Sequence, residues 1–261
     1  PKHLYLYKWL GYEVPQFAHL PLLLNDDRSK MSKRKGDVAA EAYRAKGYLP
    51  EAMVNFLALL GWNPGDDTEL MTLETLIQRF SIERITKAGA VFDREKLNWM
   101  NQHYLAHVPI DRLYPLLQPY IAQTPYAGQD EAMLRKICVA VQPALVTLPD
   151  IGKHLALFFR PDGEPVPADV REVIGVDTAQ TVFRALREKV AQAPSLTAES
   201  FTELVKAVQK DTQVKGKLLW GPLRAALTLA TEGPDLKLVV DVLGKDKILA
   251  RLDQALSERA A

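Results

Sequence analysis

Residues 30–34, which read Lys-Met-Ser-Lys-Arg, are the part of this 261-residue chain best suited to chemistry on phosphates. Five of the eight side chains in residues 28–35 are cationic, and Gly36 follows them. A short basic loop of this kind can grip a polyanion whose charge shifts during a reaction, such as the triphosphate of ATP. A solvated run of surface charge has the same composition, so residue order must decide between the two interpretations.

The elements around this basic segment belong to two kinds of pattern. A helix is predicted over residues 2–10, ending before Gly11, and the dense apolar run of residues 16–24 predicts a strand. Residues 25–27, Asn-Asp-Asp, supply turn chemistry before the basic segment. Together they predict a short α/β segment.

From residue 37 onwards the pattern is helical. Pro50 suits the first position of a helix that stops before Gly61, and residues 72–80 predict a second amphipathic helix. Phe92 and Asp93 predict a hydrophobic staple and an N-cap for a helix that runs to about Leu105.

Beyond Pro109 the chain predicts helical bundles joined by short loops. We expect helices at residues 111–120, 131–141, 147–159, 178–193, 197–209, 222–230, 236–243 and 245–256. Residues 160–167 are the richest in turn formers and predict a linker, and Gly221 and Pro222 predict a helix start or a break. The fold class is therefore mainly α, with a small α/β remnant at the beginning.

Composition sets limits on function. The formal net charge of +1 does not indicate nucleic-acid binding, so any such contact must depend on local patches. Cys138 is the only cysteine, which excludes an internal disulfide and a cysteine-based zinc site, and its apolar neighbours predict a buried thiol. No apolar stretch approaches the roughly 20 residues that span a bilayer, and no signal-peptide pattern is present, so we expect no membrane partner and a cytoplasmic protein.

The order of residues in the basic segment resembles a known signature. Lys30, Met31, Ser32, Lys33 and Arg34 resemble the second signature loop of class I aminoacyl-tRNA synthetases, and the form ending in arginine resembles the glutamyl branch. Further blocks follow in the order of bacterial-type glutamyl-tRNA synthetases, at residues 47–52, 55–62, 91–93 and 96–101. The similarity covers the whole chain, most closely up to about residue 108.

This resemblance implies the C-terminal, tRNA-binding part of a glutamate–tRNA ligase. It implies four parts: a catalytic-domain remnant (1–28), a signature loop with a helical stem-contact fold (29–108), and two all-α anticodon-binding subdomains (109–163 and 164–261). None of the five histidines lies in the first class I signature, a His-x-Gly-His-like turn. We therefore expect that the chain alone is inactive and that the parent enzyme supplies the glutamate pocket.

The resemblance also implies the roles of individual residues. Lys33 is the expected catalytic residue, and the whole loop Lys30, Met31, Ser32, Lys33 and Arg34 is expected to bind ATP. The expected tRNA contacts are Arg94, Asn101, Ala144, Lys217 and Arg224. Ala144 stands where strictly discriminating members have arginine, which predicts relaxed discrimination at the third anticodon base.

The partners implied are tRNA(Glu), with tRNA(Gln) left open, and ATP and glutamate through the N-terminal half of the parent. ATP is a substrate, accompanied by Mg in the parent enzyme, and no metal is expected to bind this chain. A monomer is expected. Two alternatives stay open: a stand-alone helical RNA-binding module, and a fragment of a class I lysyl-tRNA synthetase.

Overall fold

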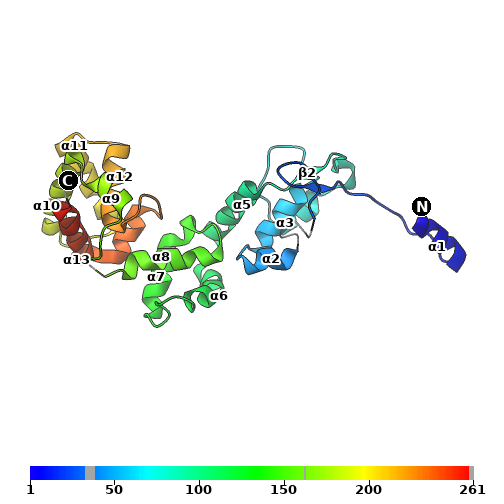
Figure 1. Cartoon of the computed structure of the whole chain (residues 1–261), viewed down its shortest axis with the longest axis horizontal. Coiled ribbons are helices and arrows are strands. Elements are labelled where there is room, and N and C mark those ends of the chain that lie inside the picture. Colours follow the sequence, from blue (N-terminus) through cyan, green and yellow to red (C-terminus); the bar gives the residue numbers. More distant parts are fainter. Residues whose placement is uncertain (33–38, 162, 259–261) are drawn as a thin grey trace. The chain divides into compact units, whose positions relative to one another are not determined.

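The computed structural model describes residues 1–32, 39–161 and 163–258 (Figure 1). The chain divides into two compact units, the first formed by Pro1–Ala42 and Pro50–Leu97 and the second by Tyr43–Leu49 and Asn98–Ala261. The predicted catalytic residue Lys33, and Arg34 beside it, lie outside the described residues. The four-part division expected from the sequence stays a prediction.

The first unit contains short elements. They are α1 (Lys2–Leu10), β1 (Leu23–Leu24), α3 (Pro50–Leu59), α4 (Leu73–Arg79), the 3-10 turn η1 (Ile82–Arg84) and β2 (Ala90–Val91). Helices α2 (Ala40–Ala45) and α5 (Arg94–His107) contain residues of both units. Gly11 ends α1 at a φ of 70°, and the Thr72 side chain caps α4 by accepting from the backbone N–H of Thr75, so both helix ends are as predicted.

The strand predicted over residues 16–24 is wrong for most of its length. Only Leu23 and Leu24 are strand, and they pair in parallel with Ala90 and Val91 of β2. Pro21 has no N–H to give to a ladder, which explains why the apolar run before it does not extend the pairing.

The N-cap predicted at the start of α5 is confirmed, while the staple between Phe92 and Leu97 stays a prediction. Asp93 Oδ1 accepts a hydrogen bond from the backbone N–H of Lys96 at 3.0 Å, which is the N-cap geometry. Phe92 is buried edge-to-face against Phe56 of α3, with ring centroids 4.9 Å apart. The helix ends at His107, two residues beyond the expected limit.

Among its described residues the second unit contains helices and connecting loops but no strand, and the mainly α fold class is confirmed. A first helical group contains α6 (Ile110–Ile121), α7 (Glu131–Val141), the 3-10 turns η2 (Gln142–Ala144) and η3 (Leu148–Asp150), and α8 (Ile151–Phe159). A second helical group contains α9 (Ala168–Ile174), α10 (Asp177–Gln192), α11 (Ala198–Thr212), α12 (Lys217–Thr228) and α13 (Leu236–Ser257). The short helix α9 was not predicted.

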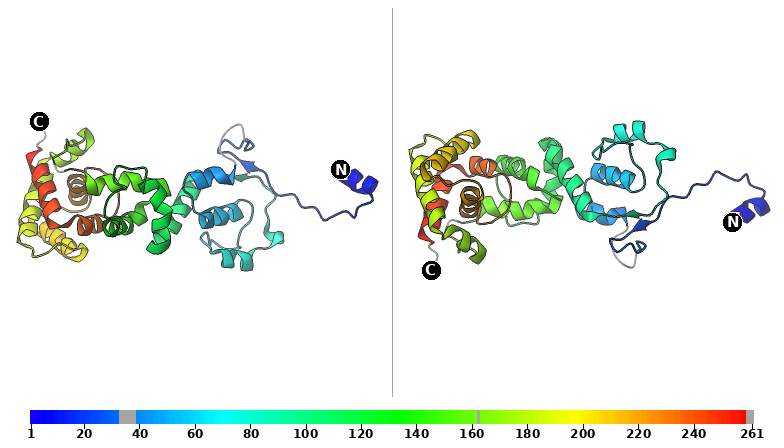
Figure 2. Two further views of the ribbon diagram at one scale, coloured as in Figure 1. Left: turned by 90° about the horizontal axis from the view of Figure 1, so that it is seen from below. Right: turned by 90° about the horizontal axis from the view of Figure 1, so that it is seen from above.

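The second helical group is built around α10. This helix packs against α11, α12 and α13, and the three long helices α10, α11 and α13 lie together in the views of Figure 1 and Figure 2. Phe183 and Phe201 are fully buried in the shared core. Gly244 has a non-helical backbone inside α13 (φ 75°, ψ 173°), which confirms the two successive helices expected there.

Helix α12 corrects the expectation for Gly221 and Pro222. The helix starts at Lys217, and Pro222 is buried inside it. A proline here costs one hydrogen bond to the carbonyl of Leu218, but the fully buried Leu219 and Leu223 on either side tie the helix to the core.

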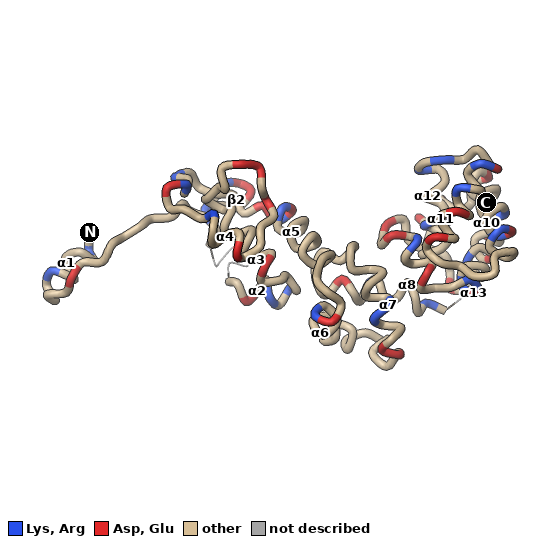
Figure 3. The backbone as a smooth tube through the Cα atoms, turned by 180° about the vertical axis from the view of Figure 1, so that it is seen from behind, with Lys and Arg blue, Asp and Glu red and all other residues tan. Residues whose placement is uncertain are grey.

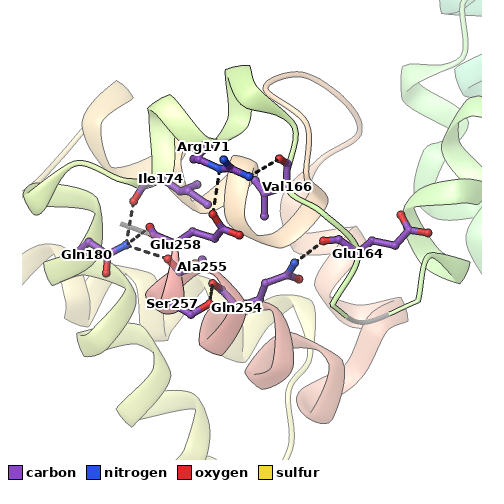
Figure 4. Close-up of polar contacts among 9 residues, drawn as sticks. All are labelled: Glu164, Val166, Arg171, Ile174, Gln180, Gln254, Ala255, Ser257 and Glu258. Carbon is purple, nitrogen blue, oxygen red and sulfur yellow. Dashed lines mark hydrogen bonds and ion pairs between the residues drawn. The ribbon is translucent and has the colours of Figure 1, made fainter. Parts of the chain in front are cut away.

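The end of α13 is fixed by a polar network, drawn in Figure 4. Gln180 Nε2 donates to the carbonyl oxygens of Ile174 at 3.1 Å, Ala255 at 2.9 Å and Glu258 at 3.4 Å. Arg171 of α9 forms an ion pair with Glu258, with N and O 3.0 Å apart. These contacts join α9, α10 and the end of α13. No helix among the described residues has both the length and the apolar character needed to cross a bilayer.

Candidate nucleic-acid interface

A tight turn carries the chain into the basic segment. The backbone N–H of Asn25 donates to the carbonyl of Ser29 at 2.8 Å, and its side-chain amide donates to the Ser29 hydroxyl at 2.8 Å. Arg28 lies in the left-handed region with a φ of 60°. The turn expected from Asn25, Asp26 and Asp27 is therefore present.

The start of the signature loop is tied to β1. Lys30 forms an antiparallel bridge with Leu24, and the Met31 N–H donates to the Leu23 carbonyl at 3.0 Å. Lys30 and Ser32 are exposed and Met31 is half-buried. This anchoring holds the Lys30 side chain on a fixed backbone, while the ATP-binding role of the loop stays a prediction.

The two tRNA contacts predicted on α5 differ in the structure. Arg94 is exposed in the first turn. Asn101 is fully buried: its Oδ1 accepts from the N–H of Leu49 at 2.8 Å, and its Nδ2 donates to the carbonyl of Val146 at 2.6 Å. Because the Asn101 amide is buried and bonded at both ends inside the chain, we correct its assignment from RNA contact to structural residue.

Near Asn101, the backbone of Gly47 lies close to that of Leu148 and to the ring of Pro149. The carbonyl of Gly47 accepts from the N–H of Leu148 at 3.1 Å, and the φ of Gly47 is 83°. A Cβ at this position would overlap the ring of Pro149. The segment Tyr43–Leu49 is thereby fixed on the turns that follow α7.

An open hollow of about 850 Å³ lies beside these turns in the second unit. Three parts of the chain form its walls: one face of α5 together with Tyr48 of the segment Tyr43–Leu49, the residues from η2 to the start of α8, and the loop before α13. The lining residues are Tyr48, Asn98, Gln102, Pro143, Ala144, Val146, Thr147, Asp150, Lys153, His154, Glu232, Gly233, Pro234 and Asp235.

The structure places Ala144 and the residues held by Arg224 on this same hollow. Ala144 is half-buried in η2, where the preceding Pro143 carbonyl accepts from Gln102 Nε2 at 2.9 Å. Arg224 Nη1 donates to the carbonyl of Pro234 at 2.6 Å. Arg224 therefore fixes the loop that faces the hollow, although it does not line the hollow itself.

The hollow carries more carboxylates than cations. Burial alone would raise the pKa of Asp150, but hydrogen bonds from Lys153 and Thr147 hold it below its ordinary value. Burial lowers the pKa of the His154 imidazole, although the nearby Asp150 carboxylate opposes this effect. With Glu232 and Asp235 also in the wall, the hollow presents mainly hydrogen-bond acceptors.

Sequence reasoning missed Asp150, His154 and the 232–235 loop. A signal existed for Asp150, because Thr147 and Asp150 form a capping box in which the Asp150 carboxylate accepts from the Thr147 N–H at 2.8 Å. For His154 and the loop no local signal exists, because only the fold brings them to Ala144.

Lys217 lies elsewhere, in the first turn of α12. It is exposed, and so are three neighbouring lysines in the sequence, Lys206, Lys210 and Lys215. Trp220, on the same helix, is 42% exposed. Figure 3 shows acidic and basic positions interspersed along the second helical group, so these lysines do not belong to a uniformly basic region. Among the described residues no cluster of three or more metal-ligating side chains is found.

Comparison with known proteins gives consistent matches. A family model described as class I tRNA synthetases (E and Q), catalytic domain, matches residues 1–99, and one described as anticodon binding domain matches residues 112–256. The glutamate–tRNA ligases of Desulforamulus reducens and Clostridioides difficile are each 40% identical, over 98% and 97% of this chain and 54% and 52% of their own length.

Solved structures agree with these matches. A glutamate tRNA ligase from Elizabethkingia meningosepticum, in complex with its amino acid, superposes with a TM-score of 0.74 and 26% identity, covering 99% of this chain and 55% of that one. The glutamate–tRNA synthetase of Elizabethkingia anophelis superposes with a TM-score of 0.73 and 26% identity, and the match covers 98% of this chain and 54% of that one. This chain spans about half the length of the curated relatives it matches.

Proposed function

Since the chain belongs to the anticodon binding domain family, within the glutamate–tRNA ligases, we propose that it is the C-terminal, anticodon-reading part of such an enzyme. The description of the catalytic match names the E and Q branch, which favours this proposal over a lysyl enzyme. The enzyme charges tRNA(Glu), and tRNA(Gln) is a second candidate substrate. It acts in the cytoplasm as a monomer.

The proposed reaction has two steps. The carboxylate of glutamate attacks the α-phosphate of ATP, giving glutamyl adenylate and pyrophosphate. A ribose hydroxyl of the terminal adenosine of tRNA then attacks the glutamyl carbonyl, which forms the ester and releases AMP. Lys33 meets the negative charge that develops on the leaving pyrophosphate, and the other cations of the signature loop bind the phosphates. Mg arrives with ATP as part of the substrate.

One observation supports the anticodon-reading role above the others. The hollow joins Ala144, the start of α8 and the loop held by Arg224, all within the residues that match the anticodon-binding family. Its acceptor-rich wall disfavours phosphates and favours the donor groups on the edges of unstacked bases. The exposed lysines of α11 and α12 are better suited to the phosphate backbone.

Binding of transcribed tRNA(Glu) to the chain tests this proposal. Replacing the three anticodon bases should weaken binding at least about tenfold, the scale of one lost set of base contacts. A control tRNA carries the same number of changes in the T loop and should bind like the unmodified molecule. Equal affinity for all three RNAs would contradict anticodon reading, and it would favour a helical module that binds RNA through its backbone alone.

A further inference from the structure

One face of α13 contacts the first helical group. Lys247, Arg251 and Gln254 recur at spacings of four and three residues, so they lie on the same side of the helix. Lys247 Nζ donates to the carbonyl of Phe158 at 2.9 Å, and Arg251 Nη2 donates to that of Leu157 at 2.5 Å. Both carbonyls belong to the last turn of α8 in the first helical group.

Gln254 continues this line of contacts. Its Nε2 donates to the carbonyl of Glu164 at 2.6 Å, in the segment that follows α8 (Figure 4). Segment 160–167, which the sequence identified as a linker, is therefore held to α13 at this point.

The chemistry of the contacts explains their placement. The last carbonyls of a helix have no partner within it, and they form the negative end of the helix dipole, where cations are stabilising. Arg251 is only 5% exposed, and its Nη1 donates to the carbonyl of Leu227 in the last turn of α12. A single buried guanidinium thus caps one helix from each helical group.

Moving the first helical group away from the second at Arg251 would cost free energy. An arginine does not lose its proton in proteins, and a buried cation deprived of its acceptors is strongly destabilising. The contacts of Arg251 with α8 and α12 therefore favour one orientation of α8 relative to α13.

The walls of the hollow belong to these same parts of the chain. Asp150, Lys153 and His154 line one wall at the start of α8, and residues 232–235 form the other wall immediately before α13. Helix α8 has nine residues, which makes it about 13 Å long. A tilt of about 5° at the end held by Arg251 would displace the other end by about 1 Å, enough to misplace hydrogen bonds to a base.

We propose that Lys247, Arg251 and Gln254 form a latch that fixes the width of the hollow and so determines how selectively it holds unstacked anticodon bases. The latch residues are positioning residues, because they bind backbone carbonyls of α8, α12 and the segment between the groups. The inference rests on the proposed anticodon-reading function for its RNA readout, while the width of the hollow can be measured without RNA.

The first experiment measures that width. Spin labels are attached to Lys153→Cys and Glu232→Cys on the two walls, and their separation is measured by pulsed electron paramagnetic resonance. Cys138 does not interfere, since it is fully buried and burial raises the pKa of its thiol to about 12. Lys247→Met and Arg251→Gln should broaden the distribution of distances, and Arg251→Lys should restore part of the order.

Lys245 provides the matched control. It is also a half-buried lysine of α13, but its Nζ donates to the carbonyls of Ala191 and Ala193, within the second helical group. Lys245→Met removes the same kind of contact and should leave the distribution unchanged. Lys247→Met retains the buried Arg251, so it tests the latch even if Arg251→Gln does not fold. An unchanged distribution in Lys247→Met would overturn the latch.

The second experiment measures selectivity. An anticodon stem–loop of tRNA(Glu) is compared with the same stem–loop carrying three replaced anticodon bases. In Lys247→Met the ratio of the two affinities should fall about tenfold, while binding of the replaced loop stays the same. Broadened distances with an unchanged ratio would overturn the positioning role. A wild-type chain that binds both loops equally would contradict the proposed function, and the distance measurement would still decide whether the latch exists.

Discussion

At the scale of single residues, two buried asparagines show how polar side chains organise this chain. Asn55 Oδ1 accepts from the backbone N–H of Met71 at 2.8 Å, and Asn101 Oδ1 accepts from that of Leu49 at 2.8 Å. Both residues are fully buried. Each binds a loop N–H that would otherwise be buried without a partner, so these asparagines specify loop positions.

Replacing Asn101 by alanine should lower the free energy of unfolding by about 2–4 kcal/mol, because the Leu49 N–H and the Val146 carbonyl both lose their partner. Urea unfolding of the chain measures the change. Gln123→Ala is the control, since its side chain is exposed and donates to the Pro119 carbonyl of its own helix region, and it should change stability by less than about 0.5 kcal/mol. Equal stability of both variants would contradict the structural role of Asn101.

A second prediction concerns Ala144 and the preference for the third anticodon base. Cytosine presents acceptors on its pairing edge where guanine presents donors, and an arginine offers only donors, whereas alanine offers neither. Ala144→Arg should therefore raise the preference for a stem–loop with C as third anticodon base over one with G by about tenfold. Competition binding with the two RNAs measures the ratio. If the unmodified chain already prefers the C stem–loop strongly and Ala144→Arg does not change this preference, residue 144 does not determine specificity.

His154 makes the stability of the folded chain depend on pH, and burial of the imidazole determines the direction of the effect. Its pKa is lowered from the ordinary 6.5, so the unfolded chain binds a proton more readily than the folded one. The stability it contributes is present above about pH 6.5 and is lost as pH falls from there through the lowered pKa. Asp150 and Lys153 face the ring and oppose each other's effect.

In His154→Gln this loss of stability on acidification should be smaller than in the unmodified chain. Urea midpoints at about pH 7.5 and about pH 5 measure the difference, since the interval spans the ordinary pKa. If the two proteins lose stability equally, His154 is protonated as easily in the folded chain as in the unfolded one.

At the scale of elements, α12 positions a loop that it does not contain. Arg224 Nη1 donates to the carbonyl of Pro234, which is ten residues later in the sequence. The helix therefore fixes the 232–235 wall of the hollow. Arg224→Ala should speed amide exchange in this loop and weaken protection of the anticodon loop roughly tenfold, with little effect at the acceptor end. Footprinting of tRNA(Glu) compares both ends. Equal loss at both ends would indicate misfolding instead.

Local signals explain which elements could be predicted from the sequence. Helix α7 has the expected bounds, since Asp130 caps it by accepting from the N–H of Met133. The predictions for the strand before residue 23 and for the start of α12 were wrong. Pro21 cannot donate to a strand ladder in the first case, and core packing overrode local preference in the second. The hollow was beyond prediction, since Ala144 and Pro234 meet only through the packing of two helical groups.

At the scale of the whole molecule, charge is nearly balanced, and the formal net charge is only +1. Long-range attraction of RNA is therefore weak, and affinity must come from local cations that displace counterions from phosphates. The exposed lysines Lys206, Lys210 and Lys217 on α11 and α12 are the candidates in the second helical group. Other basic residues form ion pairs within the chain, as Lys189 of α10 does with Asp211 of α11 at 2.7 Å.

This arrangement predicts how tRNA binding responds to salt. Each phosphate contact adds about 0.9 to the slope of log affinity against log salt for a duplex, and about 0.7 for a single strand. Lys217→Ala should therefore reduce the slope by about 1, and replacement of Lys206, Lys210 and Lys217 together by about 3. Lys189→Ala is the control, because it removes the same charge from an internal ion pair and should leave the slope nearly unchanged. Fluorescence titrations over a salt series provide the measurement. Slopes that fall equally in the control and the single variant would mean that overall charge, and not the exposed lysines, governs binding.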